Sequence, residues 1–229
     1  MTTHLAHSSL RAAASFNAGL ITVIDDWSGV PSITAYRGDD PVAGTGVDPQ
    51  TIVADYSAVI DVNANRNDPS SFTTGGISEF DGIANPTVAF QGSGAADFPN
   101  MVIYVNTLGI PNVGLSFDLR DIDGSLDNSI QQIALQYRLG NSGNFINVAY
   151  VADASSGPSL ATLVTPISAS DPAWGNQAEV QFRILTSNAV GSDEWVGIDN
   201  IAVVAVPEPS TLALLGIGAV GLLWRRRQA

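Results

Sequence analysis

Residues 113–119, VGLSFDL, place an apolar side chain at every second position from Val113 to Leu119. The same period of two recurs in residues 133–139, IALQYRL, and in residues 180–184, VQFRI. Successive side chains of a β-strand point to opposite faces, so each stretch predicts a strand with one buried face. These three segments predict a β protein.

Shorter apolar segments, separated by turns rich in glycine, serine and asparagine, continue this pattern through the rest of residues 20–206. We expect further strands over Leu20–Ile24, Ser32–Tyr36, Ala58–Val62, Thr87–Phe90, Met101–Asn106, Phe145–Val151, Leu160–Val164 and Val196–Val204, with a long loop at 37–57. Roughly ten strands joined by polar turns, and no long helical period, predict an all-β domain. The expected architecture over residues 20–206 is a two-sheet antiparallel β-sandwich of jelly-roll type.

Residues 207–229 differ from the rest of the chain. Pro207-Glu208-Pro209 ends any preceding strand, residues 211–224 (TLALLGIGAVGLLW) carry no charge, and the cluster Arg225-Arg226-Arg227 follows. We predict a single transmembrane helix over 211–224, with the arginines in the cytoplasm and residues 1–206 outside. The alternative is a buried core helix, which three consecutive arginines directly after the run disfavour.

This order of a Pro-Glu-Pro motif, a short hydrophobic segment and an arginine cluster resembles the PEP-CTERM protein-sorting signal. The resemblance implies export by a Gram-negative, biofilm-forming bacterium that makes exopolysaccharide. It also implies a partner, an exosortase-type membrane enzyme that processes the chain near Pro207, Glu208 and Pro209. The expected route runs from an inner-membrane-tethered precursor to the cell surface or the extracellular space.

The N-terminal residues 1–19 are expected to be either a mobile segment or the remnant of an export signal. They contain both histidines, His4 and His7, and the first formal charge is Arg11. The apolar residues that follow lead into Asp25-Asp26 without a small-residue cleavage site.

Charge and composition exclude several classes of function. The net charge is −13, and residues 207–229 contribute three arginines and one glutamate, so the remaining chain carries −15. This charge opposes binding to nucleic acid. The chain has no cysteine and no lysine, and its histidines lie before the first expected strand, so thiol, lysine and Ser-His-Asp chemistry are disfavoured. We therefore expect no enzyme; a carboxylate pair for glycoside hydrolysis is the remaining catalytic alternative.

An acidic segment at residues 118–128 indicates a cofactor. It carries the hard oxygen ligands that calcium prefers, at Asp118, Asp121, Asp123, Ser125, Asp127 and Asn128. Its glycine and final ligand do not follow the EF-hand spacing, and an acidic turn between two strands is the alternative.

The last expected strand contains WVGIDNI, which resembles the closing strand of extracellular jelly-roll modules, including carbohydrate-binding ones. The resemblance implies that Asp199 contributes to a structural calcium site; a bulge or turn is the alternative. Among aromatic residues in or beside loops, Trp27, Tyr36, Tyr56, Trp174 and Trp195, we single out Trp174 and Trp195 for glycan stacking. The competing interpretation is that they cover the ends of the sandwich core.

Together these features predict an exported, surface-sorted, non-catalytic β-sandwich with a structural or adhesive role in the bacterial envelope or extracellular matrix. The alternatives are a calcium-dependent module that binds polysaccharide and, second, a glycoside hydrolase.

Overall fold

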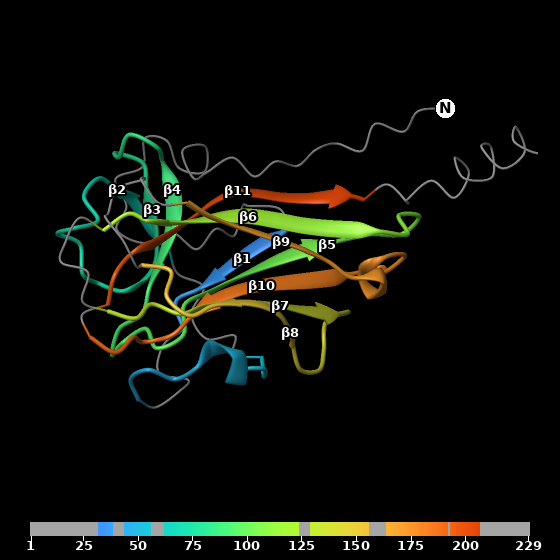
Figure 1. Cartoon of the computed structure of the whole chain (residues 1–229), viewed down its shortest axis with the longest axis horizontal. Helices are drawn as coiled ribbons and strands as arrows, with labels where there is room; N and C mark the ends of the chain where they lie inside the picture. Colours follow the sequence, from blue (N-terminus) through green and yellow to red (C-terminus); the bar gives the residue numbers. More distant parts are fainter. Residues whose placement is uncertain are drawn as a thin grey trace, which may run out of the picture.

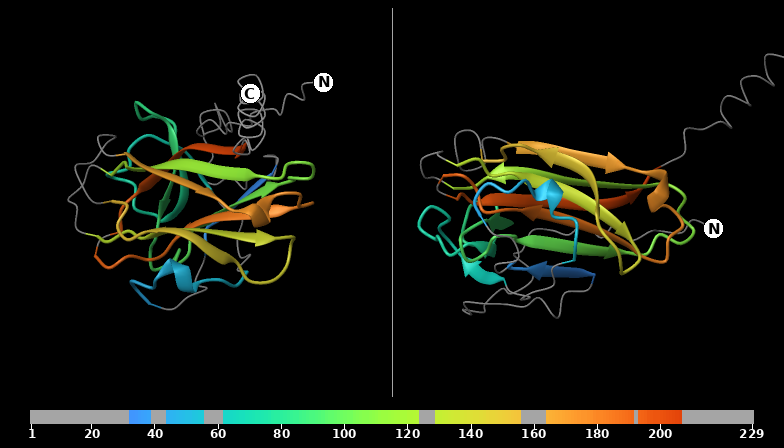
Figure 2. Two further views of the ribbon diagram at one scale, coloured as in Figure 1. Left: turned by 45° about the vertical axis from the view of Figure 1, so that its right-hand side comes forward. Right: turned by 90° about the horizontal axis from the view of Figure 1, so that it is seen from below.

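The computed structural model describes residues 32–38, 44–55, 62–123, 129–155, 164–191 and 193–206. They form two β-sheets packed face to face, which confirms the all-β, two-sheet prediction (Figures 1 and 2). The expected strand at Leu20–Ile24, the N-terminal segment 1–19 and the transmembrane helix at 211–224 lie outside these residues. Within them, no helix has the length and apolar character needed to cross a bilayer.

The first sheet has five strands and is antiparallel throughout. Its order is β1 (Ile33–Tyr36), β5 (Asn100–Val105), β10 (Val180–Thr186), β7 (Ile133–Leu139) and β8 (Ile146–Val151). The second sheet has six strands, in the order β2 (Asn63–Arg66), β3 (Gly76–Phe80), β4 (Thr87–Gln91), β11 (Val196–Ala205), β6 (Val113–Asp121) and β9 (Val164–Ser170). Only the β2–β3 pair in this sheet is parallel.

The alternating segments bury the faces that their period predicts. Leu115, Phe117 and Leu119 of β6 meet Leu135 and Phe182 of the five-stranded sheet in one core cluster. Trp174 lies in the short 3₁₀ turn η3 (Pro172–Trp174) and is 0% exposed. Its ring packs edge-to-face on Tyr137 and on Phe182, at centroid distances of 5.5 and 4.8 Å, so it closes one end of the core.

A second, smaller cluster contains Phe80, Ala89, Ile122 and Trp195, with Phe72 packed against it. The Trp195 ring stacks on Phe72 and meets Phe80 edge-on, and its indole N–H donates to the Phe72 carbonyl. Phe80 and Ala89 belong to β3 and β4, so these strands bury apolar side chains on both faces.

The structure differs from the predicted strands at three places. Strand β2 (NANR) is polar and short, and β3 (GISEF) is buried along its whole length, so neither shows the alternation that marks a one-sided strand. Strand β9 begins at Val164, where the prediction ended, and continues through Pro166. Proline is tolerated there because β9 is an edge strand, with a neighbouring strand on one side only.

Candidate functional site

The two tryptophans predicted to stack on glycans are not available for binding. Trp174 and Trp195 are both 0% exposed, and each is enclosed by the aromatic contacts described above. The glycan-stacking prediction for these residues is therefore wrong, and the competing interpretation, that they complete cores, is correct. The error arises because a tryptophan beside a turn has the same local sequence whether the turn folds inward or outward.

The outer face of the five-stranded sheet carries a row of buried polar side chains, Gln136, Arg138, Gln181 and Arg183. Strand register aligns Gln181 and Arg183 of β10 with Arg138 and Gln136 of β7, respectively. A Gln-x-Arg triplet in each of two antiparallel neighbours thus places every arginine opposite a glutamine. Both triplets, QYR and QFR, lie in strands that the sequence predicts, at the positions that alternate with the apolar ones.

Each glutamine accepts two hydrogen bonds from its opposing guanidinium. Gln136 Oε1 accepts from Arg183 Nε at 2.9 Å and Nη2 at 2.6 Å. Gln181 Oε1 accepts from Arg138 Nε at 3.2 Å and Nη2 at 2.6 Å. We call these four residues the Gln–Arg ladder.

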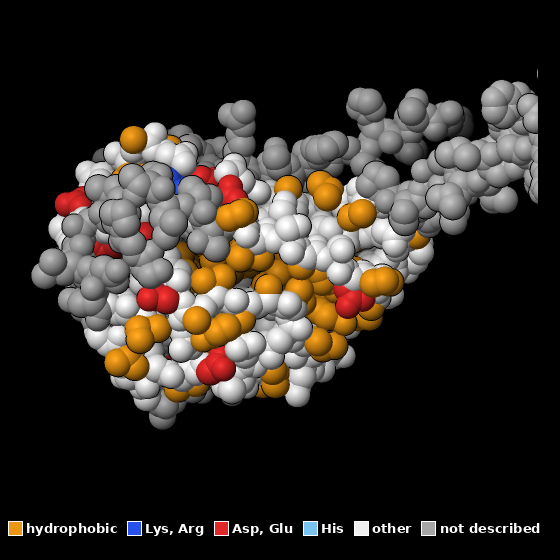
Figure 3. All heavy atoms as spheres, viewed as in Figure 1, with side chains coloured by type: hydrophobic (Ala, Val, Ile, Leu, Met, Phe, Trp, Pro, Cys, Tyr) orange, Lys and Arg blue, Asp and Glu red, His pale blue; other side chains and the backbone are white. Residues whose placement is uncertain are grey.

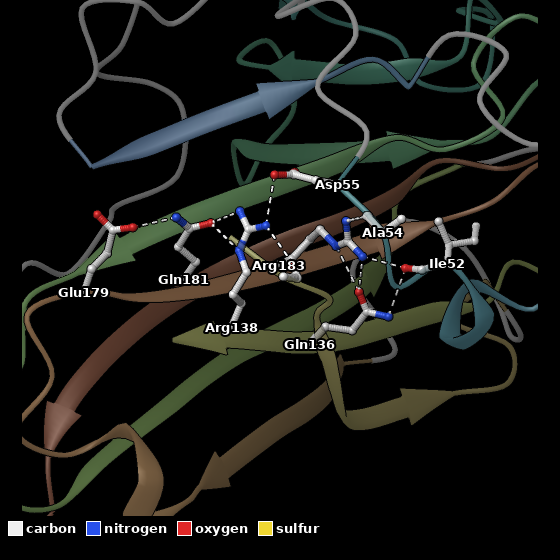
Figure 4. A network of polar contacts seen from close by, with 9 residues as sticks. Ile52, Ala54, Asp55, Gln136, Arg138, Glu179, Gln181 and Arg183 are labelled. Carbon is white, nitrogen blue, oxygen red and sulfur yellow. Dashed lines mark hydrogen bonds and ion pairs between the residues drawn. The ribbon is translucent and has the colours of Figure 1, made fainter. Parts of the chain in front are cut away.

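Arg183 fastens residues 48–55, a segment that includes the 3₁₀ turn η2 (Pro49–Thr51), over the ladder (Figure 4). Its guanidinium is buried and donates to the carbonyls of Ala54, at 2.8 Å, and Ile52. The guanidinium also lies over the Phe145 ring, with 3.8 Å between Arg183 Cζ and the ring centroid. Hydrogen bonds and this cation–π contact replace the hydration that burial removes. Residues 48–55, which belong to the predicted loop 37–57, therefore form a fixed cover over the ladder.

Arg138 forms the solvent-facing end of the ladder. It makes an ion pair with Asp55 at 2.9 Å; the Asp55 side chain is 55% exposed and the Arg138 side chain 6%. On the other side, Gln181 Nε2 donates to Glu179 Oε1 at 2.6 Å. Figure 4 shows these groups as a continuous row from Glu179 to Asp55.

Two tyrosines adjoin this row on the same face. Tyr104 is opposite Gln181 in the register, and Tyr36 comes from the edge strand β1. Tyr36 pairs with Asn100, so four residues of β5, about 13 Å of strand, separate it from Tyr104. Tyr104 nevertheless contributes to the raised pKa of Tyr36, so the two side chains approach each other on this face. Both are partly exposed.

The Tyr36 phenol is held neutral. Burial, together with the neighbouring Tyr104 side chain and the nearby charge of Asp55, raises its pKa to about 12. The pair thus presents two flat rings beside a row of amide, guanidinium and carboxylate groups. Tyr36 is among the aromatic residues that the sequence analysis considered for sugar binding. Tyr104 is not, because it lies inside an expected strand and not in or beside a loop.

The predicted calcium ligands are partly brought together. Ser125, Asp127 and Asn128 lie outside the described residues, while Asp121 and Asp123 are both buried and the Asp123 N–H donates to Asp121 Oδ1 at 3.0 Å. Among the residues that the structure describes, no three His, Cys, Asp or Glu side chains are placed to hold a metal ion. Calcium in the 118–128 segment stays a prediction.

Asp118 and Asp199 lie directly opposite each other on β6 and β11. Arg120 is 3.5 Å from Asp199, and Asn200 donates to Asp118 at 2.8 Å. Burial lowers the pKa of Arg120, and the two aspartates act in the opposite direction. These carboxylates already compensate a buried arginine, so the described geometry gives them a role that needs no metal.

A further acidic group, Asp193, is half-buried, and no ion pair is among the contacts described for it. Ala189 N–H donates to its carboxylate at 2.6 Å. Burial raises the pKa of Asp193 to about 6, against the effect of the backbone hydrogen bonds and with a small contribution from Asp97.

Replacing Arg183 by methionine should destabilise the domain strongly. The substitution Arg183→Met keeps much of the side-chain volume but leaves the carbonyls of Ile52 and Ala54 and the Gln136 Oε1 without their donors. We expect the free energy of unfolding, measured by urea denaturation, to fall by about 3 kcal/mol. The control Asp55→Asn removes an exposed ion pair and should cost less than about 1 kcal/mol. Equal costs for the two variants would contradict the assignment of Arg183 as the fastening group.

Asp193 should make stability fall as the pH rises. Its raised pKa means that the folded chain keeps a proton which the unfolded chain, with a carboxyl pKa of 3.8, has released. Its contribution to stability is therefore present below pH 3.8 and is lost as the pH approaches about 6. The free energy of unfolding, measured by urea denaturation at several pH values in this range, should fall less steeply with pH for Asp193→Asn than for the native chain. Identical slopes would exclude this titration.

A family model for the PEP-CTERM protein-sorting motif matches residues 205–227. No curated protein sequence matches the chain. The match includes the Pro-Glu-Pro motif, the apolar segment and the arginine cluster, in agreement with the resemblance seen in the sequence.

Solved structures with a similar arrangement of strands include carbohydrate-binding β-sandwich modules. TmCBM61, in complex with β-1,4-galactotriose, has 12% sequence identity over 54% of this chain and 72% of that chain, with a TM-score of 0.35. The xylan-binding module CBM15 has 12% identity over 53% and 78%, with a TM-score of 0.38. The enzymatically active domain of tailspike protein 4 from bacteriophage CBA120 has 9% identity over 53% of this chain and 16% of that chain, with a TM-score of 0.35. Scores of this size carry no information about function. The sorting motif, in contrast, identifies the chain as an exported protein whose precursor is anchored in a membrane and sorted to the surface.

Proposed function

We propose that this exported protein is a non-catalytic adhesive β-sandwich that binds polysaccharide on the outer face of its five-stranded sheet. The single observation that carries the proposal is the pair of partly exposed tyrosines, Tyr36 and Tyr104, on the same face as the Glu179-to-Asp55 row and next to it. An adhesive role in the envelope or extracellular matrix follows from surface sorting combined with such a binding face.

The chemistry of this face suits a sugar polymer. A tyrosine ring offers a flat apolar surface to the C–H groups of a pyranose, and its hydroxyl exchanges hydrogen bonds at the ring edge. Asp55 and Glu179 are carboxylates that accept hydrogen bonds from sugar hydroxyls. The Gln–Arg ladder holds both of them in place, through Arg138 and Gln181 respectively.

A non-catalytic role is supported by the side chains that the chain lacks and by the state of those on the face. There is no cysteine or lysine in the sequence, and the two histidines belong to residues 1–19. Asp55 already forms an ion pair with Arg138 at 2.9 Å. Glycoside hydrolysis, the second alternative, would need one carboxyl of a pair to hold a proton.

Delivery to the surface uses the C-terminal segment. We propose that residues 211–224 hold the precursor in the inner membrane, that Arg225, Arg226 and Arg227 keep the C-terminus cytoplasmic, and that an exosortase-type enzyme acts near Pro207-Glu208-Pro209. The processed protein would then reach exopolysaccharide outside the cell.

Binding to a broad glycan array tests the adhesive function. The native chain should bind at least one polysaccharide, and Tyr36→Ala and Tyr104→Ala should each weaken binding about 10-fold or more, because loss of a stacking ring costs on the order of 1 to 2 kcal/mol. The matched control is Tyr150→Ala, on the edge strand β8, which should bind normally. If the native chain binds no glycan on the array, a purely structural role remains. Release of reducing ends from any polysaccharide would instead make the protein a glycosidase.

Calcium should stabilise the folded domain if residues 118–128 bind it. A ligand that binds only the folded state raises the melting temperature with its concentration. We expect the native chain to melt higher in millimolar calcium than in chelator, and Asp127→Asn to lose this difference. Identical melting curves for the native chain would remove calcium from the proposal; arrays run with and without calcium show whether glycan binding depends on it.

The sorting segment has a separate test. Replacing Pro207, Glu208 and Pro209 by alanines should leave the protein in the membrane fraction at its unprocessed mass, because the motif that the processing enzyme reads is absent while the apolar segment remains. Mass spectrometry of membrane and extracellular fractions measures this. Unchanged processing would show that the motif is not the signal.

A further inference from the structure

The folded sandwich continues up to the residue before the sorting motif. Ala205, the last residue of β11, pairs with Val113, and the Val206 N–H donates to the Asn112 carbonyl at 2.9 Å. Pro207 is the next residue. No flexible linker therefore separates the domain from the Pro-Glu-Pro motif.

The chain between the domain and the predicted membrane segment is short. Residues 207–210 are the only ones between Val206 and the apolar run that begins at Thr211. Four residues span at most about 14 Å when fully extended. The interfacial layer on each side of the hydrocarbon core is roughly 5 to 8 Å thick, so this end of the sandwich is confined to the neighbourhood of the lipid headgroups.

Exposed apolar side chains are concentrated at the same end. Strand register places the ends of β5, β7 and β11 and the start of β10 together there, because Val105 and Leu139 both pair with Val180. Among the described residues, five of the eight large hydrophobic side chains that are most exposed lie at this end: Leu108, Leu139, Ile146, Val204 and Val206. Figure 3 shows apolar side chains reaching the right-hand end of the molecule, and no Lys or Arg of the described residues appears there in this view.

The β5–β6 loop, residues 106–112, presents the most exposed of these side chains on a fixed turn. Its sequence, NTLGIPN, has no charge. Thr107 is 0% exposed, and its hydroxyl donates to the Trp174 carbonyl at 2.6 Å while accepting from Gln177 N–H at 2.9 Å. Gly175 packs so closely that a Cβ there would lie 1.9 Å from the Pro111 carbonyl oxygen. Leu108 is thus 60% exposed on a loop held rigidly to the core.

We propose that this end of the sandwich, with Leu108 at its tip, rests in the headgroup layer of the bilayer while the precursor is anchored. The proposal rests on the predicted membrane segment 211–224. An apolar tip on an uncharged loop suits the interfacial layer, where apolar side chains leave water. The acidic side chains at this end, Asp171 and Glu179, are partly exposed and hydrogen-bonded, and the negative charge of the domain favours neutral over anionic lipid.

The absence of cysteine permits a direct test on the full chain. Leu108→Cys and Val190→Cys each create one labelling site, and the native side chains are equally exposed, at 60% and 57%. Val190 follows β10 and lies at the opposite end, since β10 begins at the Val206 end. Each variant carries a polarity-sensitive fluorophore and is reconstituted into phosphatidylcholine vesicles that contain lipids with a headgroup quencher.

We expect quenching at position 108 to exceed that at position 190 several-fold in chains that float with the vesicles. Insertion of a long Gly-Ser linker between Val206 and Pro207 should leave flotation unchanged and abolish the difference. Flotation with equal quenching at both positions would overturn the proposal and assign the exposed tip to a protein partner. Failure of the chain to float would overturn both the membrane segment and the proposal, whereas persistence of the difference with the long linker would overturn the role of the short tether.

Discussion

The buried charge of Arg183 organises the outer face of the five-stranded sheet. A guanidinium removed from water must find its hydrogen-bond acceptors in the protein, since an unpaired buried charge costs several kcal/mol. Gln136 supplies one acceptor from the neighbouring strand, and Ile52 and Ala54 supply carbonyls from a segment about 130 positions earlier in the chain. A side chain in β10 thereby helps to fix the position of residues 48–55, together with Gln136, whose Nε2 donates to the Ile52 carbonyl at 3.3 Å.

The cover that Arg183 holds also limits the surface left for ligands. Ile52 packs on Phe98, Ala134 and Leu185 over one part of the sheet, where it closes a small apolar cluster. The part next to β1 and β5 carries Tyr36 and Tyr104 instead, with their side chains partly exposed. The proposed binding face is consequently a lateral strip of the sheet that runs along the strands.

This arrangement places two surfaces on one rigid domain, and Glu179 lies at the border between them. The tyrosine strip lies on the side of the sandwich, whereas Val206 leaves from one end, directly before the sorting motif. A domain tethered by its end keeps its side accessible to a polymer outside the membrane. β11 lies between β4 and β6 over Val196, Gly197 and Ile198, and its C-terminal half, which leads to Val206, pairs with β6.

The sequence by itself determined the features that depend on neighbours along the chain. The period of two in VGLSFDL, IALQYRL and VQFRI predicted β6, β7 and β10. The sorting signal could be recognised from the sequence because its parts follow one another along the chain. Tertiary structure decided what depends on partners distant in sequence. Trp174 and Trp195 turn inward, and Asp199 forms an ion pair with Arg120. The two Gln-x-Arg triplets lie opposite each other and form the Gln–Arg ladder. A local pattern specifies which face of a strand is apolar, but the side chain that a polar or aromatic residue meets is set by strand order and register.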